Sequence, residues 1–267
     1  MSHFADYIKR VLVAPHQLNG SDVLERYGSQ SADAGVSSPV FHSVRAISGA
    51  ARRVRPGDTI WWFSQLQWVG KRRLPPSLDA RIEVAEVSDT GDGRMRFEAG
   101  PGSCWFPLWD ADSLLHKLEV KSSDGAVSSL LVSPSQAAGQ ALRFMREVHD
   151  PGPLLKHTQA ISNISHDFVS YRIDDGTELA FECVARLLDS GRSVFWDRWS
   201  LPRRLAEKGV HIDSIILESH IKTAIDQARV VWGVRSPSYG AEGTYSKLEM
   251  ELAKSQGKLQ HFPPLDH

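Results

Sequence analysis

The stretch His166–Trp196, HDFVSYRIDDGTELAFECVARLLDSGRSVFW, decides the fold of the C-terminal part of the chain. Its first six residues are rich in β-formers and predict a short strand. Polar residues 172–176 end that strand, and Thr177–Asp189 then has the apolar spacing of a helix that packs one face against a core. A second strand is predicted at Ser193–Trp196. Strands that alternate with helices in this way indicate an α/β domain with a parallel sheet.

The alternation continues towards the end of the chain. A helix is predicted from Asp213 to Gln227, an apolar strand from Ala228 to Val234, and a last helix that carries Tyr245 and Glu249. A strand that is apolar throughout is typical of a parallel sheet covered on both faces. We therefore expect the first strand, His166–Tyr171, to lie between the second and the third, with ligands bound beyond the carboxyl ends of the strands.

The N-terminal part has mostly strand patterns. Strands are predicted at Asp58–Phe63, after an Arg-Pro-Gly turn, and at Ala80–Val87, which Arg94–Ala99 would pair across a turn. A helix is predicted from an N-cap at Ser133, with Pro134 as its first residue, to Val148. The chain thus divides into a β-rich domain with flanking helices (1–150), a linker rich in proline and glycine (151–163) and an α/β domain (164–267). The order of PGD turn, strand, long loop and alternating strand resembles PUA-like barrels.

Five tryptophans of the N-terminal part lie near two basic runs in the sequence. The basic runs are 52–55 and 71–73, and the tryptophans are Trp61, Trp62, Trp68, Trp105 and Trp109. Aromatic rings beside cations can clamp a nucleotide or a single-stranded nucleic acid. Alternatively, the tryptophans fill the core, with Trp61 or Trp62 at its centre, and the arginines form a solvated rim. The acidic residues of this part favour the second interpretation.

Composition excludes several classes of protein. The 267 residues carry 31 basic and 32 acidic side chains, so the net charge gives no reason to expect nucleic acid or an anionic membrane as a partner. The apolar run at the N-terminus is too short for a secretory signal, and no stretch approaches a membrane span. Cys104 and Cys183 lie far apart without metal-ligand spacing, which favours two reduced thiols, no metal site and a cytoplasmic protein.

Four segments in the C-terminal part together resemble the TIR domain, the Toll/interleukin-1 receptor module. Phe168–Arg172 resembles its first strand, and Val194–Trp199 resembles its second strand with the start of the following loop. Val230–Tyr239 resembles its third strand with a serine-proline-aromatic exit. Tyr245–Glu249 resembles the helix in which an aromatic residue precedes a glutamate by four positions. The resemblance covers about residues 164–267 and implies a flavodoxin-like sheet.

The resemblance also implies an activity. In the TIR domains that are enzymes, the glutamate acts in cleaving NAD⁺ between ribose and nicotinamide, and the matching position here is Glu249, on a helix surface that we expect to be exposed. NAD⁺ is then the substrate, and no cofactor is needed. A carboxylate near the ribose stabilises the positive charge that develops when neutral nicotinamide leaves. The resemblance places the dinucleotide near five further residues, which are Tyr171, Arg172, Trp196, Trp199 and Tyr245.

Three functions remain open. The first is a bacterial-type NAD⁺ glycohydrolase that forms homo-oligomers through TIR–TIR contacts, acts in anti-phage immunity and responds to an unidentified trigger at the N-terminal domain. The second is a non-catalytic TIR adaptor that assembles through the loop Trp199–Arg204. The third is a nucleic-acid-binding N-terminal module with a structural α/β partner. The pattern departs from the family at Tyr245 and Ser246, where tryptophan and cysteine are usual, and at the early end of the chain. Only Lys258–Phe262, the N-terminal part or a second copy is then left to cover the outer edge of the third strand.

Overall fold

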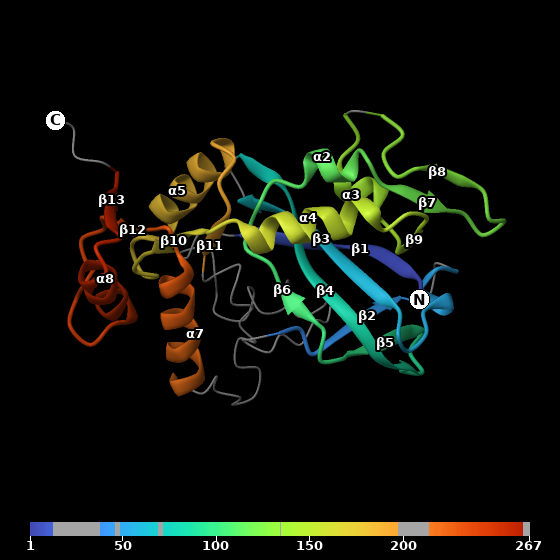
Figure 1. Cartoon of the computed structure of the whole chain (residues 1–267), viewed down its shortest axis with the longest axis horizontal. Helices are drawn as coiled ribbons and strands as arrows, with labels where there is room; N and C mark the ends of the chain where they lie inside the picture. Colours follow the sequence, from blue (N-terminus) through green and yellow to red (C-terminus); the bar gives the residue numbers. More distant parts are fainter. Residues whose placement is uncertain (13–37, 46–48, 69–71, 134, 197–213, 264–267) are drawn as a thin grey trace.

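The computed structural model describes residues 1–12, 38–45, 49–68, 72–133, 135–196 and 214–263. These residues form two sheets side by side, a larger one near the N-terminus and a smaller one near the C-terminus (Figure 1). No helix among them is both long and apolar enough to cross a membrane. The predicted β-rich and α/β parts are both present.

The larger sheet has the strand order β2-β5-β4-β3-β1-β9-β7-β8, with β6 paired to β4. Its strands are β1 (His3–Leu12), β2 (Phe41–Arg45), β3 (Thr59–Trp68), β4 (Arg73–Asp89), β5 (Arg94–Ala99), β6 (Cys104–Trp105), β7 (Glu119–Lys121), β8 (Val127–Ser129) and β9 (Arg146–Val148). The three predicted strands are confirmed, since they lie in β3, β4 and β5, and β5 pairs antiparallel with β4. The sheet curls on itself, because His42 of β2 reaches Asp6 of β1 at 2.7 Å although three strands lie between β2 and β1 in the order.

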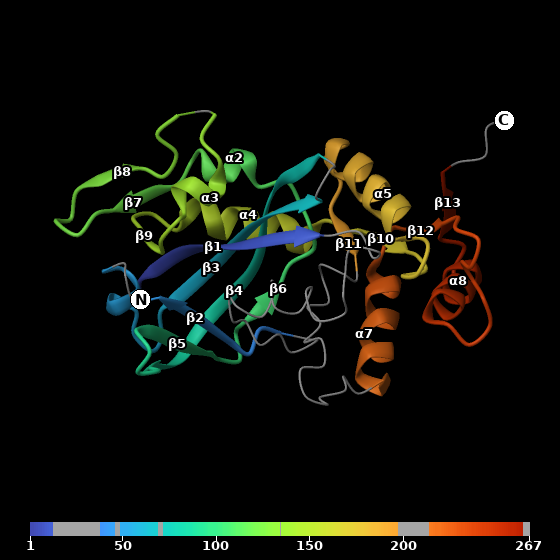
Figure 2. The same ribbon diagram turned by 180° about the vertical axis from the view of Figure 1, so that it is seen from behind.

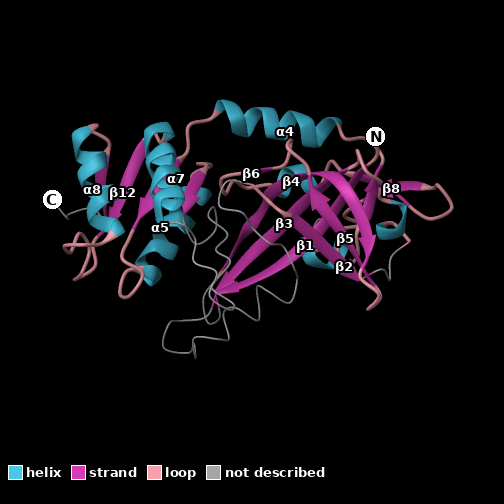
Figure 3. Ribbon diagram, turned by 90° about the horizontal axis from the view of Figure 1, so that it is seen from below, coloured by secondary structure: helices cyan, strands magenta, loops and turns pink. Residues whose placement is uncertain are grey.

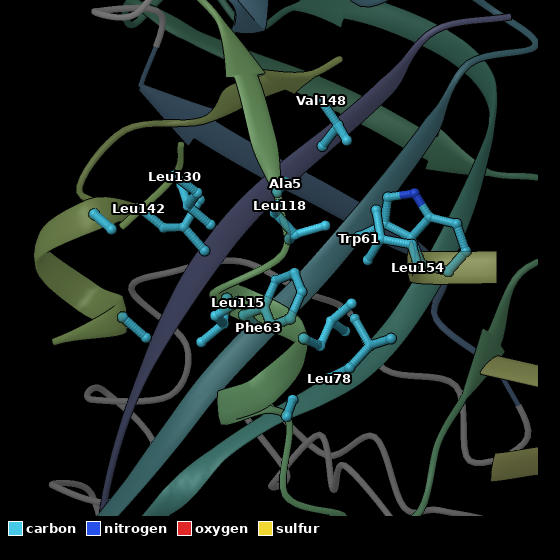
Figure 4. Packing of buried hydrophobic residues seen from close by; sticks show 14 of the residues in the cluster. Ala5, Trp61, Phe63, Leu78, Leu115, Leu118, Leu130, Leu142, Val148 and Leu154 are labelled. Atoms are coloured by element: carbon cyan, nitrogen blue, oxygen red, sulfur yellow. The ribbon is translucent and has the colours of Figure 1, made fainter. Parts of the chain in front are cut away.

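The tryptophans at the centre of this sheet form its core. Trp61 and Trp62 are fully buried and point to opposite faces of β3, as alternate residues of a strand must. Trp61 packs with Phe63, Leu78 and Leu154 in the cluster drawn in Figure 4. A base cannot reach either ring, so Trp61 and Trp62 cannot clamp a nucleotide or a single-stranded nucleic acid. Arg53 and Arg72 form ion pairs with Glu147 and Asp189, while Lys71 and the side chain of Trp68 lie outside the described residues.

The prediction of one helix over 133–148 is wrong, because only the short helix α3 (Ala138–Ala141) forms among the described residues there. Position 134 lies outside the described residues, and residues 146–148 form strand β9. Leu142 and Val148 pack into the cluster of Trp61, whereas Met145 packs into the cluster of Trp62. The apolar residues of this segment therefore enter two cores, which a single helix face could not reach. Two other short helices of this part are η2 (Ala51–Arg53) and α2 (Asp112–Leu115).

The segment predicted as a linker forms helix α4 (Gly152–Asn163), which lies lengthwise beside the larger sheet before the chain enters the smaller one (Figure 3). Leu154, Thr158 and Ile161 are buried at helical spacing. Pro153 is tolerated because it occupies the first turn, where the missing N–H has no intrahelical partner to lose. The proline and glycine residues here begin a helix, and the prediction of a linker was wrong on this point.

The smaller sheet has four parallel strands in the order β11-β10-β12-β13. They are β10 (Asp167–Ser170), β11 (Val194–Trp196), β12 (Val230–Val234) and β13 (Leu259–Phe262). Helix α5 (Thr177–Asp189) covers one face, and α7 (Ser214–Gln227) and α8 (Tyr245–Ser255) cover the other; Figures 1 and 2 show α5 above and α7 below the strands. The central place of the first strand is confirmed. So is the covered edge of β12, because β13 pairs with it.

The two sheets contact each other directly. Leu108, which follows β6, exchanges two backbone hydrogen bonds with Val194 of β11, of 2.7 and 2.8 Å. Leu66, Leu74 and Leu108 join the hydrophobic cluster under α5. Trp109 donates from its indole nitrogen to the carbonyl oxygen of Gly191 at 3.2 Å. The outer edge of β11 is thus covered by the N-terminal part of the chain.

His157 of α4 gives this junction a pH dependence. Its ring stacks on Trp109, with 4.7 Å between the centroids, and burial together with the positive charge of Lys117 lowers the pKa of His157 to about 4. The folded protein therefore favours the neutral ring. The resulting stability is complete above pH 6.5 and is lost as the pH falls towards 4.

We expect the His157→Phe variant to lose less stability than the wild type between pH 7 and pH 4. Between pH 7 and pH 4, the free energy of unfolding of the wild type should fall further than that of the variant, by as much as about 3 kcal/mol, as follows from the pKa shift. Urea unfolding at both pH values measures it. His116→Phe is the matched control, since His116 is exposed. Equal pH dependence of the wild type and both variants would contradict the prediction.

Candidate functional site

The candidate site lies at the carboxyl ends of β10 and β12. From β10 the chain crosses through α5 to β11 on one side, and from β12 it crosses through α8 to β13 on the other side. The crossovers therefore lie on opposite faces of the sheet and diverge between β10 and β12. In open α/β sheets this is the place where the ends of the strands leave room for a ligand.

Glu249 points into this place from α8. The buried residues of the helix are Ser246, Glu249 and Ala253, which share one face by their spacing. Glu249 is only 6% exposed, and its Oε2 accepts a hydrogen bond of 2.6 Å from the hydroxyl of Ser170, the last residue of β10. The prediction of an exposed position for Glu249 is wrong, because α8 packs this face against the sheet.

Tyr239 extends the contact to a third element, the loop after β12. Its phenol oxygen donates to Oγ of Ser170 at 3.0 Å, so Tyr239, Ser170 and Glu249 form a directed chain of hydrogen bonds. Burial raises the pKa of Tyr239 to about 12, and the negative charge of Glu249 also raises it. The phenol is therefore a neutral donor at physiological pH. This chain fixes the position of the Glu249 carboxylate.

Gly233 makes room for the tyrosine. A Cβ atom at this position would lie 2.7 Å from the hydroxyl oxygen of Tyr239, closer than any side chain permits. Neither Tyr239 nor Ser170 was predicted at the site from the sequence. A glycine inside the apolar strand VVWGV was the available signal, because such a glycine often marks a close approach of another group.

The loops that follow β10 and β12 are tied together at the same edge. Asp175 accepts hydrogen bonds from the hydroxyl of Ser236 at 2.6 Å and from the backbone N–H of Ser238 at 2.9 Å. Burial raises the pKa of Asp175, but these hydrogen bonds outweigh it and hold the pKa below its ordinary value. Arg172 pairs with Asp174 at 2.6 Å. Nε of Arg172 and Oγ of Ser238 are buried and have no hydrogen-bond partner among the described residues.

The other residues expected at the site are placed differently. Trp196 is fully buried and packs against Tyr171 and Phe181 under α5, so no face of its ring is open to a base. Tyr171 is also part of that core. The predictions for Trp196 and Tyr171 are wrong for the same reason. Helix α5 covers the side chains at the ends of β10 and β11 that face it. Tyr245 is 40% exposed at the start of α8, and Trp199 lies outside the described residues.

The two cysteines are free thiols. Cys183 is buried, and burial together with the negative charge of Asp167 raises its pKa to about 12. Burial also raises the pKa of Cys104. Within the described part of the chain, no group of three or more histidine, cysteine, aspartate or glutamate side chains is placed to hold a metal ion.

In comparisons with models of protein families, with curated proteins and with solved structures, this chain has no significant match.

Proposed function

We propose that this protein is an NAD⁺ glycohydrolase of the TIR type, with Glu249 as its catalytic carboxylate. One observation carries the proposal. A buried carboxylate, held by Ser170, stands at the carboxyl ends of β10 and β12, where the crossovers of the sheet diverge. The strand order β11-β10-β12-β13 agrees with the flavodoxin-like order, in which the first strand lies between the second and the third.

The proposed reaction breaks the bond between the ribose C1′ and the nicotinamide nitrogen. The electron pair of that bond leaves with nicotinamide, and water adds to C1′, so NAD⁺ and water give nicotinamide, ADP-ribose and a proton. The positive charge of the nicotinamide ring is neutralised as it leaves, while positive charge develops on the ribose. A fixed carboxylate stabilises that developing charge without having to reorganise. Attack by a ribose hydroxyl of the substrate in place of water would give a cyclic product.

Two further observations support a polar ligand at this edge. The buried Nε of Arg172 and Oγ of Ser238 have no partner among the described residues, and buried polar atoms left unpaired cost free energy. A phosphate oxygen or ribose hydroxyl would supply the missing partner. Tyr245 is exposed one turn before Glu249, where it can contact a ligand that reaches the carboxylate.

The proposal includes activation by assembly. A carboxylate that is 6% exposed has little surface for a substrate, so α8 or the loop before it must shift for cleavage to occur. Contacts between copies of the α/β domain, triggered at the N-terminal domain, would bias the chain towards the open arrangement. The loop proposed for such contacts, Trp199–Arg204, lies outside the described residues.

Incubation of the purified protein with NAD⁺ tests this function directly. We expect nicotinamide release whose rate per molecule rises as the protein is concentrated and assembles. Chromatography separates nicotinamide, ADP-ribose and a cyclic product, and light scattering on the same samples reports assembly. Assembly without any nicotinamide release would contradict the proposed enzyme and would favour a non-catalytic adaptor.

A further inference from the structure

A cavity opens on the face of the smaller sheet that is opposite to α8 and Glu249. Helix α5 packs against β10, β11 and β12 on this face, and its Arg186 reaches Phe262 of β13. The cavity left beside α5 has a volume of about 400 Å³. That size lies in the range of small-molecule sites, roughly 300–1,000 Å³.

The walls of the cavity are mostly apolar. Cys183 and Leu187 of α5 face Trp232 of β12 and Phe262 of β13 across it. The indole nitrogen of Trp232 donates to Asp167 at 3.0 Å, which fixes the ring. A rigid aromatic wall of this kind suits a flat, apolar group, because stacking adds to the free energy of burial.

The rim of the cavity is positively charged. Arg186 and Arg192 line it, and Arg192 pairs with Asp167 at 2.7 Å. Asp167 also pairs with Arg229, at 2.9 Å, but Arg229 does not line the cavity. Arg186 lies over the ring of Phe262, 5.2 Å from its centroid, and no carboxylate of the described residues pairs with it. Its donors are open to an anion.

One polar atom inside the cavity adds to this pattern. Nδ1 of His261, a residue that lines the cavity, is buried and has no hydrogen-bond partner among the described residues. Buried nitrogen atoms in proteins are rarely left in this state, and each one needs an explanation. A bound ligand with an acceptor or hydroxyl group would satisfy it.

We propose that this cavity is a second ligand site, distinct from the Glu249 site, for a small molecule that joins one aromatic ring to one acidic group. The ring lies against Trp232 and Phe262, and the acidic group meets Arg186. Carboxylates and phosphates share the required chemistry, since a guanidinium donates two parallel hydrogen bonds to either.

Titration of the full chain with phenyl phosphate and with benzoate tests the proposal. We expect saturable binding by calorimetry with a Kd of about 1 mM or tighter, as small fragments allow. Benzamide, which is neutral, and inorganic phosphate, which lacks the ring, should bind at least about tenfold more weakly. The stronger of the two anionic probes identifies the acidic group. The indole N–H signal of Trp232, assigned with Trp232→Phe, should shift during the titration in a ¹H–¹⁵N spectrum.

Arg186→Gln should weaken phenyl phosphate binding roughly tenfold and leave the fold intact, because Arg186 is exposed. Arg143→Gln is the matched control, since Arg143 is also exposed and also lies over a phenylalanine ring, that of Phe144, in the N-terminal part. It should not change binding. NAD⁺ cleavage plays no part in these measurements, so their outcome is independent of the proposed enzyme.

Three results would overturn the second site. They are the absence of saturable binding by both anionic probes, equal affinity for benzamide and phenyl phosphate, and unchanged binding by Arg186→Gln. Dimerisation that is abolished by Arg186→Gln, with no effect of the probes, would instead identify this face as an interface between copies of the chain.

Discussion

Glu249→Gln is expected to lower the rate of NAD⁺ cleavage by the assembled protein at least a hundredfold. The substitution removes the negative charge and keeps the size of the side chain, and electrostatic stabilisation of a transition state typically contributes factors of about 10² to 10³. The amide oxygen can still accept the hydrogen bond from Ser170, so the fold should change little. Because the charge acts only as the ribosyl cation develops, kcat should fall more than the affinity for NAD⁺. Nicotinamide release at several NAD⁺ concentrations measures both.

Glu251→Gln is the matched control on the same helix. Glu251 is 61% exposed at its side chain and contacts Lys247 at 3.6 Å, away from the buried face of α8. Its substitution should leave the rate within about twofold, as for an exposed ion pair. Glu249→Ala differs from both, since it also leaves a cavity and removes the acceptor of the Ser170 hydroxyl, and it should lower the free energy of unfolding by about 2 kcal/mol. Full activity of Glu249→Gln would show that the carboxylate is structural.

Asp167→Asn is expected to lower the free energy of unfolding by about 3 kcal/mol. Asp167 is fully buried at the start of β10, and its Oδ2 accepts from Arg192 and Trp232 while its Oδ1 accepts from Arg229. Whichever way an asparagine amide turns, its NH₂ group meets donors on one side. Arg192 and Arg229 keep some access to water, which lowers the loss below that of a wholly buried pair. Chemical unfolding monitored by circular dichroism gives the value.

Asp189→Asn provides the comparison for Asp167. Its carboxylate pairs with Arg72 at 2.8 Å, but 55% of its side chain is exposed and it stands at the C-terminal end of α5, where a negative charge opposes the helix dipole. We expect a change below about 1 kcal/mol, because exposed ion pairs contribute little. A loss equal to that of Asp167→Asn would mean that the contact between the two sheets, and not burial of the charge, dominates stability.

The segments whose apolar residues pack into a single hydrophobic core were predictable from the sequence. Helix α5 has the predicted bounds, Thr177–Asp189, because its apolar face packs against a single cluster. Strands β10, β11 and β12 also lie where periodicity placed them, since short apolar strands between amphipathic helices have few alternatives. Patterns of this kind depend on neighbours in the sequence, and the tertiary structure leaves them unchanged.

The predictions failed where one segment supplies side chains to two cores, or where a surface distant in the sequence stabilises a helix. The segment 133–148 supplies Leu142 to one core and Met145 to another, which overrides its helical spacing. Proline and glycine at 151–153 begin α4 because the larger sheet offers a face for Leu154 and Ile161. Sequence spacing carries no information about which of two surfaces a side chain will meet.

The same distinction applies to the site. The order of motifs in the sequence singled out Glu249, and the spacing of α8 put it on a helix. Only the tertiary structure decided that this glutamate is buried, that Ser170 and Tyr239 hold it, and that Trp196 belongs to the core. Ser170 lies 79 positions before Glu249 in the sequence, and Tyr239 lies on a different element, so this chain of hydrogen bonds follows from the packing of α8 on the sheet. The sequence determines which side chains each helix and strand carries. The burial of a side chain and its distance from other groups are determined only when separate elements pack together.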